Sequence, residues 1–202
     1  DPVSRDVFTP MPASIITILL FGLIRAALVA LDMTNLHELS GRMLAQPFAK
    51  GGDSLGFGVL YSVASQVLWF FGAHGPNMLF AVENDILVPA ALSNMDAIAH
   101  GTAPPFIFTK MFFDAYTRMG GSGSTLALCL AIFLRGKDRG VKKLCLFALL
   151  PTLCNVNEPL LFGIPLVLNP VYFIPFILVP AVQTAIAYAA TVAGFIPPAS
   201  AD

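Results

Sequence analysis

A single carboxylate inside a long uncharged interval limits the possible folds of this chain more than any other feature. Between Lys143 and Asp202 the only formal charge is Glu158, and most of the other residues are apolar. A carboxylate at membrane depth costs about 2.5–3.5 kcal/mol on insertion scales, and more where it meets lipid directly. Glu158 is therefore expected to face a protein interior or a water-filled cavity. The alternative is a loop at the membrane surface in which Glu158 is solvated.

Hydrogen-bonding groups and helix breakers surround this carboxylate. Asn155 and Asn157 precede Glu158, and two prolines and a glycine follow before the chain reaches Leu166. Broken backbone at membrane depth is tolerated only where protein buries it or where it lines an aqueous cavity. The stretch therefore predicts a polar substrate site in a membrane protein.

The composition agrees with a membrane protein. Of the 202 residues, 56% are hydrophobic and 11% are charged, whereas soluble domains carry about 25% charged residues. We interpret the chain as an all-α polytopic membrane protein or a part of one. The net charge of -1, without a basic stripe, gives no indication of nucleic-acid binding, and none is expected.

The three cysteines are interpreted as small buried hydrophobic residues. Cys129, Cys145 and Cys154 lie in apolar sequence, without a CxxC pair or a histidine at metal-ligand spacing. No metal site and no cofactor is therefore expected. Because the sequence begins at Asp1 and stops shortly after an apolar segment, we also expect that it is a fragment of a longer chain.

Two apolar segments are predicted to cross the membrane near the start of the chain. Residues Met11 to Leu31 are apolar except for Arg25 and meet the length of about 20 residues that a spanning helix needs. Arg25 is expected to snorkel to the interface or to lie at a pore edge. Leu55 to Phe71 carries no charge and is predicted to be the second span.

The segment between these two spans has a different pattern. In residues 32–53, leucine, methionine and phenylalanine recur at helical spacing between charged residues. This pattern predicts an amphipathic helix at the membrane interface, with Asn35 as its N-cap and His37 on its solvated face.

A histidine follows the second predicted span. His74 lies between glycines in the stretch from Trp69 to Asn77, where Pro76 ends or kinks the helix. An intramembrane ionisable residue is a functional hypothesis by default, and an aromatic ring beside polar groups suits a sugar. On a continuing helix, Trp69 would point some distance around from His74. The alternative is an interfacial tryptophan belt with a capping histidine.

Residues 83–109 mix prolines with short apolar runs, none of them long enough to span a bilayer. We interpret this region as a re-entrant hairpin or an external lid rather than a crossing helix. Its ionisable residues are expected to be in water: Glu83, Asp85, Asp96 and His100.

A glycine-rich turn then precedes a regular helical pattern. Residues 119–125 read MGGSGST, and a helix is predicted from Ser124 to Leu134. A glycine-rich turn that opens a helix exposes backbone N–H groups and a positive dipole end. These groups suit an anion or a hydroxyl-rich ligand, although the turn lacks the lysine and the spacing of a P-loop.

The densest basic cluster of the chain gives an expected orientation. Residues 135–143 carry five of the lysines and arginines, and short basic loops lie on the cytoplasmic side of the membrane. The apolar segment that follows breaks at the stretch around Glu158. A re-entrant segment to about Asn169 and a further span from Phe173 are predicted beyond it.

Four ordered stretches resemble a known family. Asn155–Pro165 reads NVNEPLLFGIP, Trp69–Gly75 reads WFFGAHG, Arg118–Leu126 reads RMGGSGSTL and Phe8–Thr17 reads FTPMPASIIT. Together they resemble the membrane-embedded IIC permease of the bacterial sugar phosphotransferase system, in its lactose/cellobiose/chitobiose branch. The resemblance runs nearly from end to end.

The resemblance implies an architecture. Family members have about ten spans, in an N-terminal oligomerisation half and a C-terminal transport half with re-entrant hairpins. Residues 1–54 would be the end of the first half, with one span plus the amphipathic helix. Residues 55–202 would be the transport domain, incomplete at its C-terminus. The full-length protein would be a homodimer in lipid, with several passes through the bacterial inner (plasma) membrane.

The resemblance also implies a reaction. A β-linked disaccharide would bind near the midplane and move inward with the transport domain. A phosphocysteine on the separate IIB partner would then phosphorylate it, so the phosphoryl donor lies outside this chain. Glu158 would be the general base for the attacking hydroxyl, and His74 would bind that hydroxyl. Ala73 replaces a bulkier residue of the family, which leaves the choice of sugar open.

The site that the resemblance implies has further members. The polar shell would include Asn155, Asn157 and the glycine-rich backbone, and Trp69 would stack on a sugar ring. The complete set of candidate residues is Trp69, His74, Gly75, Asn77, Gly121, Ser122, Thr125, Asn155, Asn157 and Glu158.

Two other functions are compatible with these residues. One is a membrane sugar sensor that drives a fused cytoplasmic signalling domain, which sequence beyond Asp202 would reveal. The other is an ion-coupled transporter or channel in which Glu158 is the ion site. It would show sodium- or proton-dependent flux without a phosphate donor.

Overall fold

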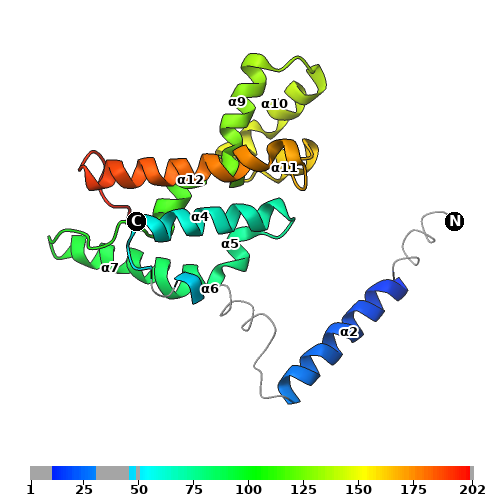
Figure 1. Cartoon of the computed structure of the whole chain (residues 1–202), viewed down its shortest axis with the longest axis horizontal. Coiled ribbons are helices and arrows are strands. Elements are labelled where there is room, and N and C mark those ends of the chain that lie inside the picture. The colour runs from blue at the N-terminus through cyan, green and yellow to red at the C-terminus, as the bar shows by residue number, and fades with distance from the viewer. Residues whose placement is uncertain (1–10, 31–45, 49–50, 201–202) are drawn as a thin grey trace. The chain divides into compact units, whose positions relative to one another are not determined.

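The computed structural model describes residues 11–30, 46–48 and 51–200, and all regular structure within them is helical (Figure 1). The chain divides into two compact units, Asp1–Met43 and Leu44–Asp202. Three helical stretches are long and apolar enough to cross a membrane: Met11–Ala30, Lys110–Arg135 and Pro170–Val192.

The first unit contains helix α2 (Met11–Ala30), which has 20 residues. At 1.5 Å per residue such a helix is about 30 Å long, which matches the hydrocarbon thickness of a bilayer. The prediction of a helix of spanning length is confirmed, and Arg25 is exposed on it. Most of the predicted amphipathic helix, including Asn35 and His37, lies outside the described residues. Within that segment the structure describes a short 3₁₀ turn, η1 (Gln46–Phe48).

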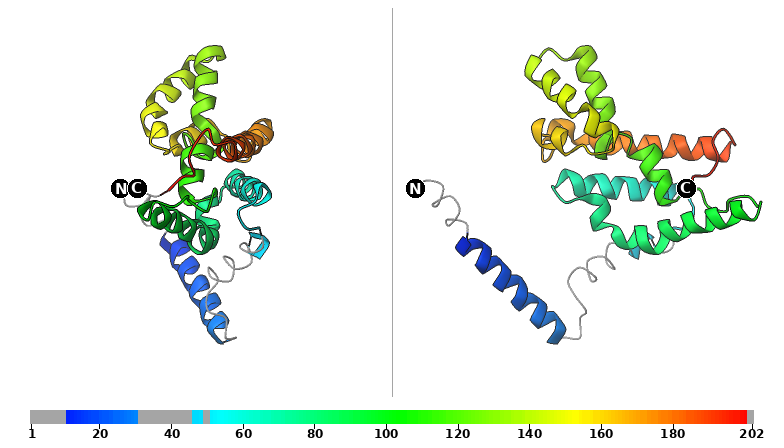
Figure 2. Two further views of the ribbon diagram at one scale, coloured as in Figure 1. Left: turned by 90° about the vertical axis from the view of Figure 1, so that its left-hand side faces the viewer. Right: turned by 180° about the vertical axis from the view of Figure 1, so that it is seen from behind.

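The second unit is built on two helices that lie side by side, α4 (Leu55–Phe70) and α12 (Pro170–Val192) (Figures 1 and 2). α4 has 16 residues, so it is shorter than the predicted span and than the length of about 20 residues that crosses a bilayer. α12 begins earlier than the predicted Phe173, because the side chain of Asn169 caps the helix and Pro170 suits its first turn.

A helical hairpin of α9 (Thr125–Arg135) and α10 (Arg139–Leu153) lies on one side of the α4–α12 pair (Figures 1 and 2). Asp138 caps α10 and accepts hydrogen bonds from two backbone N–H groups. The basic cluster runs from the last residue of α9 through the tight turn into the start of α10. Cys129 and Cys145 are buried in this hairpin, as predicted. The prediction is wrong for Cys154, which is exposed directly after the end of α10.

Short helices lie on the opposite side of the pair. They are α5 (Gly75–Met78), α6 (Phe80–Val82), the π-helical turn η2 (Glu83–Leu87) and α7 (Val88–Ala99). From Phe80 to Ala99 the helical run is unbroken, so this region is more regular than its prolines and short apolar runs indicated. The run is not among the described helices that are apolar enough to cross a membrane, which agrees with the interpretation that it is not a crossing helix. Pro89 lies inside the run, just after the π-helical turn η2, and such local adjustments can compensate for its missing N–H.

The remaining elements lead to the hairpin and to α12. Helix α8 (Lys110–Phe112) continues into the π-helical turn η3 (Phe113–Thr117), and the 3₁₀ turn η4 (Ser122–Ser124) precedes α9. Helix α11 (Glu158–Gly163) follows α10. The predicted re-entrant segment is thus a short helix followed by a non-helical connection to Asn169.

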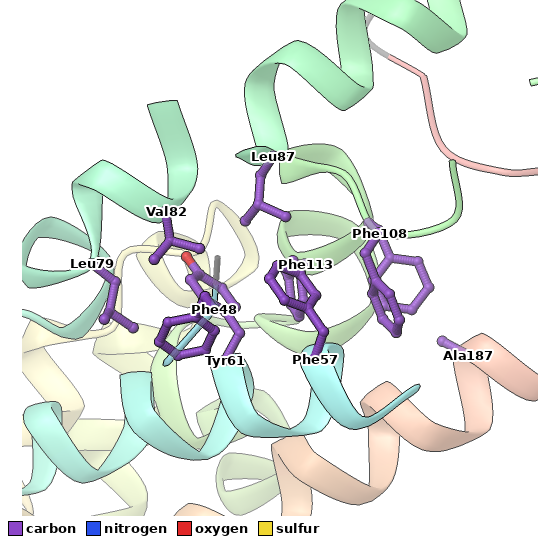
Figure 3. Packing of buried hydrophobic residues seen from close by; sticks show 10 residues of the cluster. Phe48, Phe57, Tyr61, Leu79, Val82, Leu87, Phe108, Phe113 and Ala187 are labelled. Atoms are coloured by element: carbon purple, nitrogen blue, oxygen red, sulfur yellow. The ribbon is translucent and has the colours of Figure 1, made fainter. Parts of the chain in front are cut away.

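Aromatic rings fill the core between α4, η3 and α12 (Figure 3). The ring of Phe108 stacks on that of Tyr188, with centroids 5.3 Å apart, and it also packs over Gly58 of α4. The buried members of this cluster are Phe48, Phe57, Tyr61, Leu79, Val82, Leu87, Phe108, Phe112, Phe113 and Ala187.

Two glycines of α4 test this packing. A Cβ at position 58 would lie 2.2 Å from the ring of Phe108, whereas a Cβ at position 56 would meet nothing closer than 3.9 Å. We expect Gly58→Ala to lower the free energy of unfolding by about 1–3 kcal/mol through overpacking. Gly56→Ala should leave it unchanged or raise it, because alanine favours helix. Thermal unfolding in detergent measures both; equal stability of the two variants would contradict this packing.

Candidate functional site

A polar cavity of about 130 Å³ lies where α4, η3, α11 and the glycine-rich loop meet. It brings together residues from all three sequence stretches that were expected to form the site, those around Trp69, Gly121 and Glu158. Its lining residues are Trp69, His74, Pro76, Asp114, Arg118, Gly121, Ser122, Asn155, Asn157 and Glu158.

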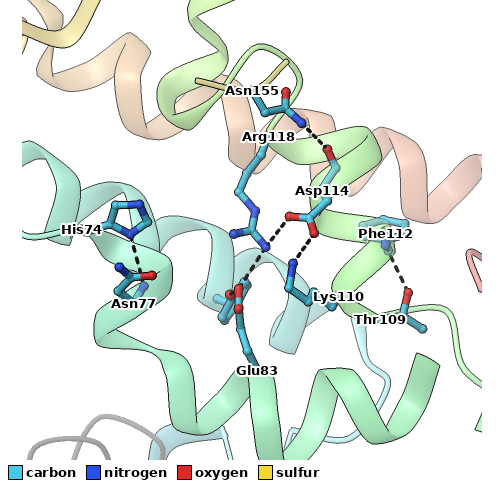
Figure 4. Close-up of polar contacts among 10 residues, drawn as sticks. His74, Asn77, Glu83, Thr109, Lys110, Phe112, Asp114, Arg118 and Asn155 are labelled. Atoms are coloured by element: carbon cyan, nitrogen blue, oxygen red, sulfur yellow. Dashed lines mark hydrogen bonds and ion pairs between the residues drawn. The ribbon is translucent and has the colours of Figure 1, made fainter. Parts of the chain in front are cut away.

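One wall of the cavity is formed by two rings. The ring centroids of Trp69 and His74 are 4.6 Å apart, with an angle of 51° between the planes. The two side chains would point apart only on a continuing helix, and the helix does not continue: α4 ends at Phe70 and the chain turns before His74. His74 caps α5: its Nδ1 accepts a hydrogen bond from the backbone N–H of Asn77 at 3.3 Å (Figure 4). In neutral His74 the proton is therefore on Nε2, which remains available as a donor.

A second wall is the glycine-rich loop, residues 120–124. Gly120, Gly121, Gly123 and Ser124 all have positive φ angles, a conformation that glycine adopts at little cost. A Cβ at Gly121 would lie 2.3 Å from Cγ of Asn157. The loop therefore depends on its glycines both for its backbone shape and for its close approach to the stretch around Glu158.

The two asparagines of that stretch hold this loop. Asn155 Oδ1 accepts a hydrogen bond from the backbone N–H of Gly120 at 2.8 Å. Asn157 Nδ2 donates to the carbonyl of Ser122 at 2.7 Å and to Oγ1 of Thr125 at 2.9 Å. The loop and the carboxylate stretch are thus cross-linked by side chains, and Asn157 is buried between them.

Glu158 is the first residue of α11 and lies half-buried at the cavity. A carboxylate in this position interacts favourably with the positive end of the helix dipole. Its Oε2 atom is buried and has no hydrogen-bond partner among the described residues. The prediction that Glu158 faces a protein interior or a cavity agrees with this placement.

Two further buried polar atoms on the cavity residues also lack a partner in the described part of the chain. They are Trp69 Nε1 and Arg118 Nε. Buried polar atoms without hydrogen-bond partners are uncommon in native proteins, so a partner for each of them is expected. Two donors and one acceptor on residues that line one cavity are compatible with a ligand that carries hydroxyl groups, because a hydroxyl both donates and accepts.

Sequence reasoning missed an ion-pair network at this cavity, which Asp114 and Arg118 line. Arg118 Nη2 lies 3.0 Å from Glu83 Oε1 and 2.9 Å from Asp114 Oδ1 (Figure 4). Lys110 pairs with Asp114, and the hydroxyl of Tyr61 donates to Glu83 Oε1 at 2.7 Å. The spacing of Lys110, Asp114 and Arg118 was a signal, because residues four apart share one face of a helix.

The expectation that Glu83 lies in water is wrong. Its side chain is 14% exposed, because it pairs with Arg118 inside the second unit. The same expectation is confirmed for the other three residues of its group, Asp85, Asp96 and His100, which are exposed.

Three candidate residues do not line the cavity. Gly75 lets α5 approach α4 closely, since a Cβ there would lie 2.0 Å from the carbonyl oxygen of Ser65. Asn77 uses its backbone N–H to bind His74. Thr125 lies behind the glycine-rich loop, where its hydroxyl donates to the carbonyl of Gly120 at 2.6 Å.

The family described as "Phosphotransferase system, EIIC" matches residues 1–180 of this chain. The chain is 34% identical over 202 residues to the oligo-beta-mannoside-specific EIIC component of Bacillus subtilis, covering 98% of this chain and 45% of that protein. It is 31% identical over 218 residues to the cellobiose-specific EIIC component of Lactococcus lactis, covering 98% of this chain and 44% of that protein.

A solved structure is similar as well. The crystal structure of the transporter ChbC, the IIC component of the N,N'-diacetylchitobiose-specific phosphotransferase system, matches with a TM-score of 0.71 at 31% identity. The match covers 100% of this chain and 48% of ChbC, so the chain spans less than half of the length of these relatives. With the family match over most of its residues, this chain belongs to the EIIC family of sugar permeases of the phosphotransferase system.

Proposed function

We propose that this chain supplies the sugar site of a phosphoenolpyruvate-dependent phosphotransferase permease in the bacterial plasma membrane. In the full-length protein, which we propose to be a homodimer, the site takes up a β-linked disaccharide. The observation that carries the proposal is the cavity itself, whose lining residues Trp69, Arg118 and Glu158 each carry a buried polar atom without a partner among the described residues. A hydroxyl-rich ligand in the cavity would give these side chains polar partners.

The relatives support this class of substrate and partner. Two of them are named for oligo-beta-mannosides and cellobiose. A lactose-specific relative of Streptococcus mutans is named an EIICB component, so its name joins the IIC and IIB designations. We infer that the present chain acts with a phosphorylated IIB subunit.

The site residues have distinct roles in this proposal. Trp69 stacks on the apolar face of a sugar ring and donates a hydrogen bond from Nε1, and Nε2 of His74 donates to the reacting hydroxyl. The oxygen of that sugar hydroxyl bonds to phosphorus while the S–P bond of the IIB phosphocysteine breaks. Glu158 accepts the proton that the hydroxyl loses. Phosphoryl transfer needs mainly positioning and charge stabilisation, so a permease that orients the hydroxyl contributes directly to the reaction.

The variant Trp69→Phe tests sugar binding at the cavity. Phenylalanine keeps a ring for stacking but removes the Nε1 donor, so we expect the dissociation constant for the disaccharide to rise roughly two- to tenfold. The measurement is an equilibrium titration of the detergent-solubilised full-length protein with cellobiose, diacetylchitobiose and lactose. Phe71→Leu is the control, since that ring is 64% exposed. Equal affinity of Trp69→Phe and wild type would count against the proposal.

A further inference from the structure

The glycine-rich loop (residues 120–124) is held by side chains from outside itself. Four carboxamides from three separate parts of the chain bind it: Gln66, Asn155, Asn157 and Gln183. Gln66 Oε1 accepts a hydrogen bond from the backbone N–H of Gly123 at 2.9 Å, and Gln183 accepts one from the hydroxyl of Ser124. A loop with four residues at positive φ thus takes its shape from these partners.

Gln66 and Gln183 are the two members of this set that nothing in the catalytic proposal uses. Gln66 lies in the C-terminal half of α4, is 1% exposed, and is not among the described residues that line the cavity. A buried carboxamide without a hydrogen bond costs free energy, so its place in an apolar helix is explained by the bond to Gly123. The opposite side of Gly123 packs on the ring of Phe176, where a Cβ would be 2.3 Å away.

The position of Gln66 connects two walls of the cavity. Gln66 and Trp69 are three residues apart on α4, so they lie on neighbouring positions of one helix face. Through Gly123, Gln66 therefore sets where Gly121 and Ser122 lie relative to the ring of Trp69. Asn157 holds the same loop from the other side, through the carbonyl of Ser122.

We propose that Gln66 is a positioning residue for sugar binding. It holds the glycine-rich loop in place relative to the ring of Trp69. In this way Gln66 affects the affinity for the disaccharide without contacting the sugar. The chemical step is left to Glu158 and His74. This inference rests on the proposed function of the cavity.

The variant Gln66→Met tests the inference in membranes that contain the full-length protein and phosphorylated IIB. Methionine keeps the length of the side chain but has no acceptor for Gly123. We expect the half-saturating disaccharide concentration for phosphorylation to rise roughly 5- to 150-fold, the range for a buried group left unpaired. The rate at saturating sugar, per copy of folded protein, should stay within about twofold of wild type.

The matched control is Ser62→Ala, one turn earlier on α4. Ser62 is also 1% exposed, and its hydroxyl has no partner within the described residues, so its removal perturbs the buried helix without reaching the loop. The half-saturating disaccharide concentration of Ser62→Ala should equal that of wild type. A double variant with Asn157→Ala should lose less affinity than the sum of the single losses, because both residues act through one loop.

The outcomes separate this inference from the function on which it rests. If wild type phosphorylates the sugar, two results for Gln66→Met overturn the inference alone. The first is an unchanged half-saturating disaccharide concentration. The second is an unchanged half-saturating concentration together with a lower rate at saturating sugar. The second pattern would mark Gln66 as a purely structural residue. Absence of saturable phosphorylation in wild type overturns the proposed function and this inference together.

Discussion

Replacing Glu158 by glutamine is expected to lower the rate of sugar phosphorylation by roughly 10²- to 10⁴-fold, the usual contribution of a general base. Glutamine has nearly the same shape and can still hydrogen-bond to a sugar hydroxyl, but it cannot accept the proton as phosphoryl transfer proceeds. The measurement is the formation of phosphorylated disaccharide by membranes that contain the full-length variant and phosphorylated IIB, at saturating sugar.

The control for this variant is Asp96→Asn, which makes the same change of carboxylate to carboxamide. The side chain of Asp96 is 77% exposed and pairs with His100 at the surface, so its rate should equal that of wild type. A near-normal rate in Glu158→Gln would exclude the carboxylate as the base. Sodium- or proton-dependent flux without IIB, abolished by the same variant, would instead identify Glu158 as an ion site.

Replacing Arg118 by methionine is expected to be the most destabilising of these changes. The guanidinium binds Glu83 and Asp114, and the side chains of Arg118 and Glu83 are only 13% and 14% exposed. Removing one partner of a buried ion pair leaves uncompensated charge and costs about 3–5 kcal/mol. The free energy of unfolding of the full-length protein in detergent should fall by about that amount.

Two companion variants show whether the loss comes from the ion pairs. Adding Glu83→Gln to Arg118→Met should recover part of the stability, because it removes the carboxylate that loses its cation, whereas Asp114 keeps Lys110. Arg135→Met changes an exposed arginine at the end of α9 and should alter stability by no more than about 0.5 kcal/mol. If Arg118→Met were as stable as Arg135→Met, the network would not contribute to the stability of this fold.

Much of the site could be predicted from the sequence because its members cluster in short stretches. Glu158 was identifiable as a lone carboxylate in apolar sequence, and the glycines of residues 120–124 indicated an unusual backbone. The length of α2 followed from a stretch that is apolar except for Arg25. In each case the signal was local, because burial and backbone conformation restrict the residue types that a segment can carry.

The rest depends on contacts between distant parts of the chain. The ion pair of Glu83 with Arg118 and the bond of Gln66 to Gly123 each join separate segments, so neither segment alone shows its partner. The contact between the rings of Trp69 and His74 depends on where α4 ends, and helix ends are the least predictable part of an element.

The most direct test of the proposed sugar site is a structure of the full-length protein determined with a bound β-linked disaccharide. We expect one sugar ring in the cavity, stacked on Trp69, with hydroxyl groups within hydrogen-bond distance of Trp69 Nε1 and Glu158 Oε2. These are the buried atoms that have no partner among the described residues here. A disaccharide bound elsewhere, with this cavity occupied by water alone, would contradict the proposal.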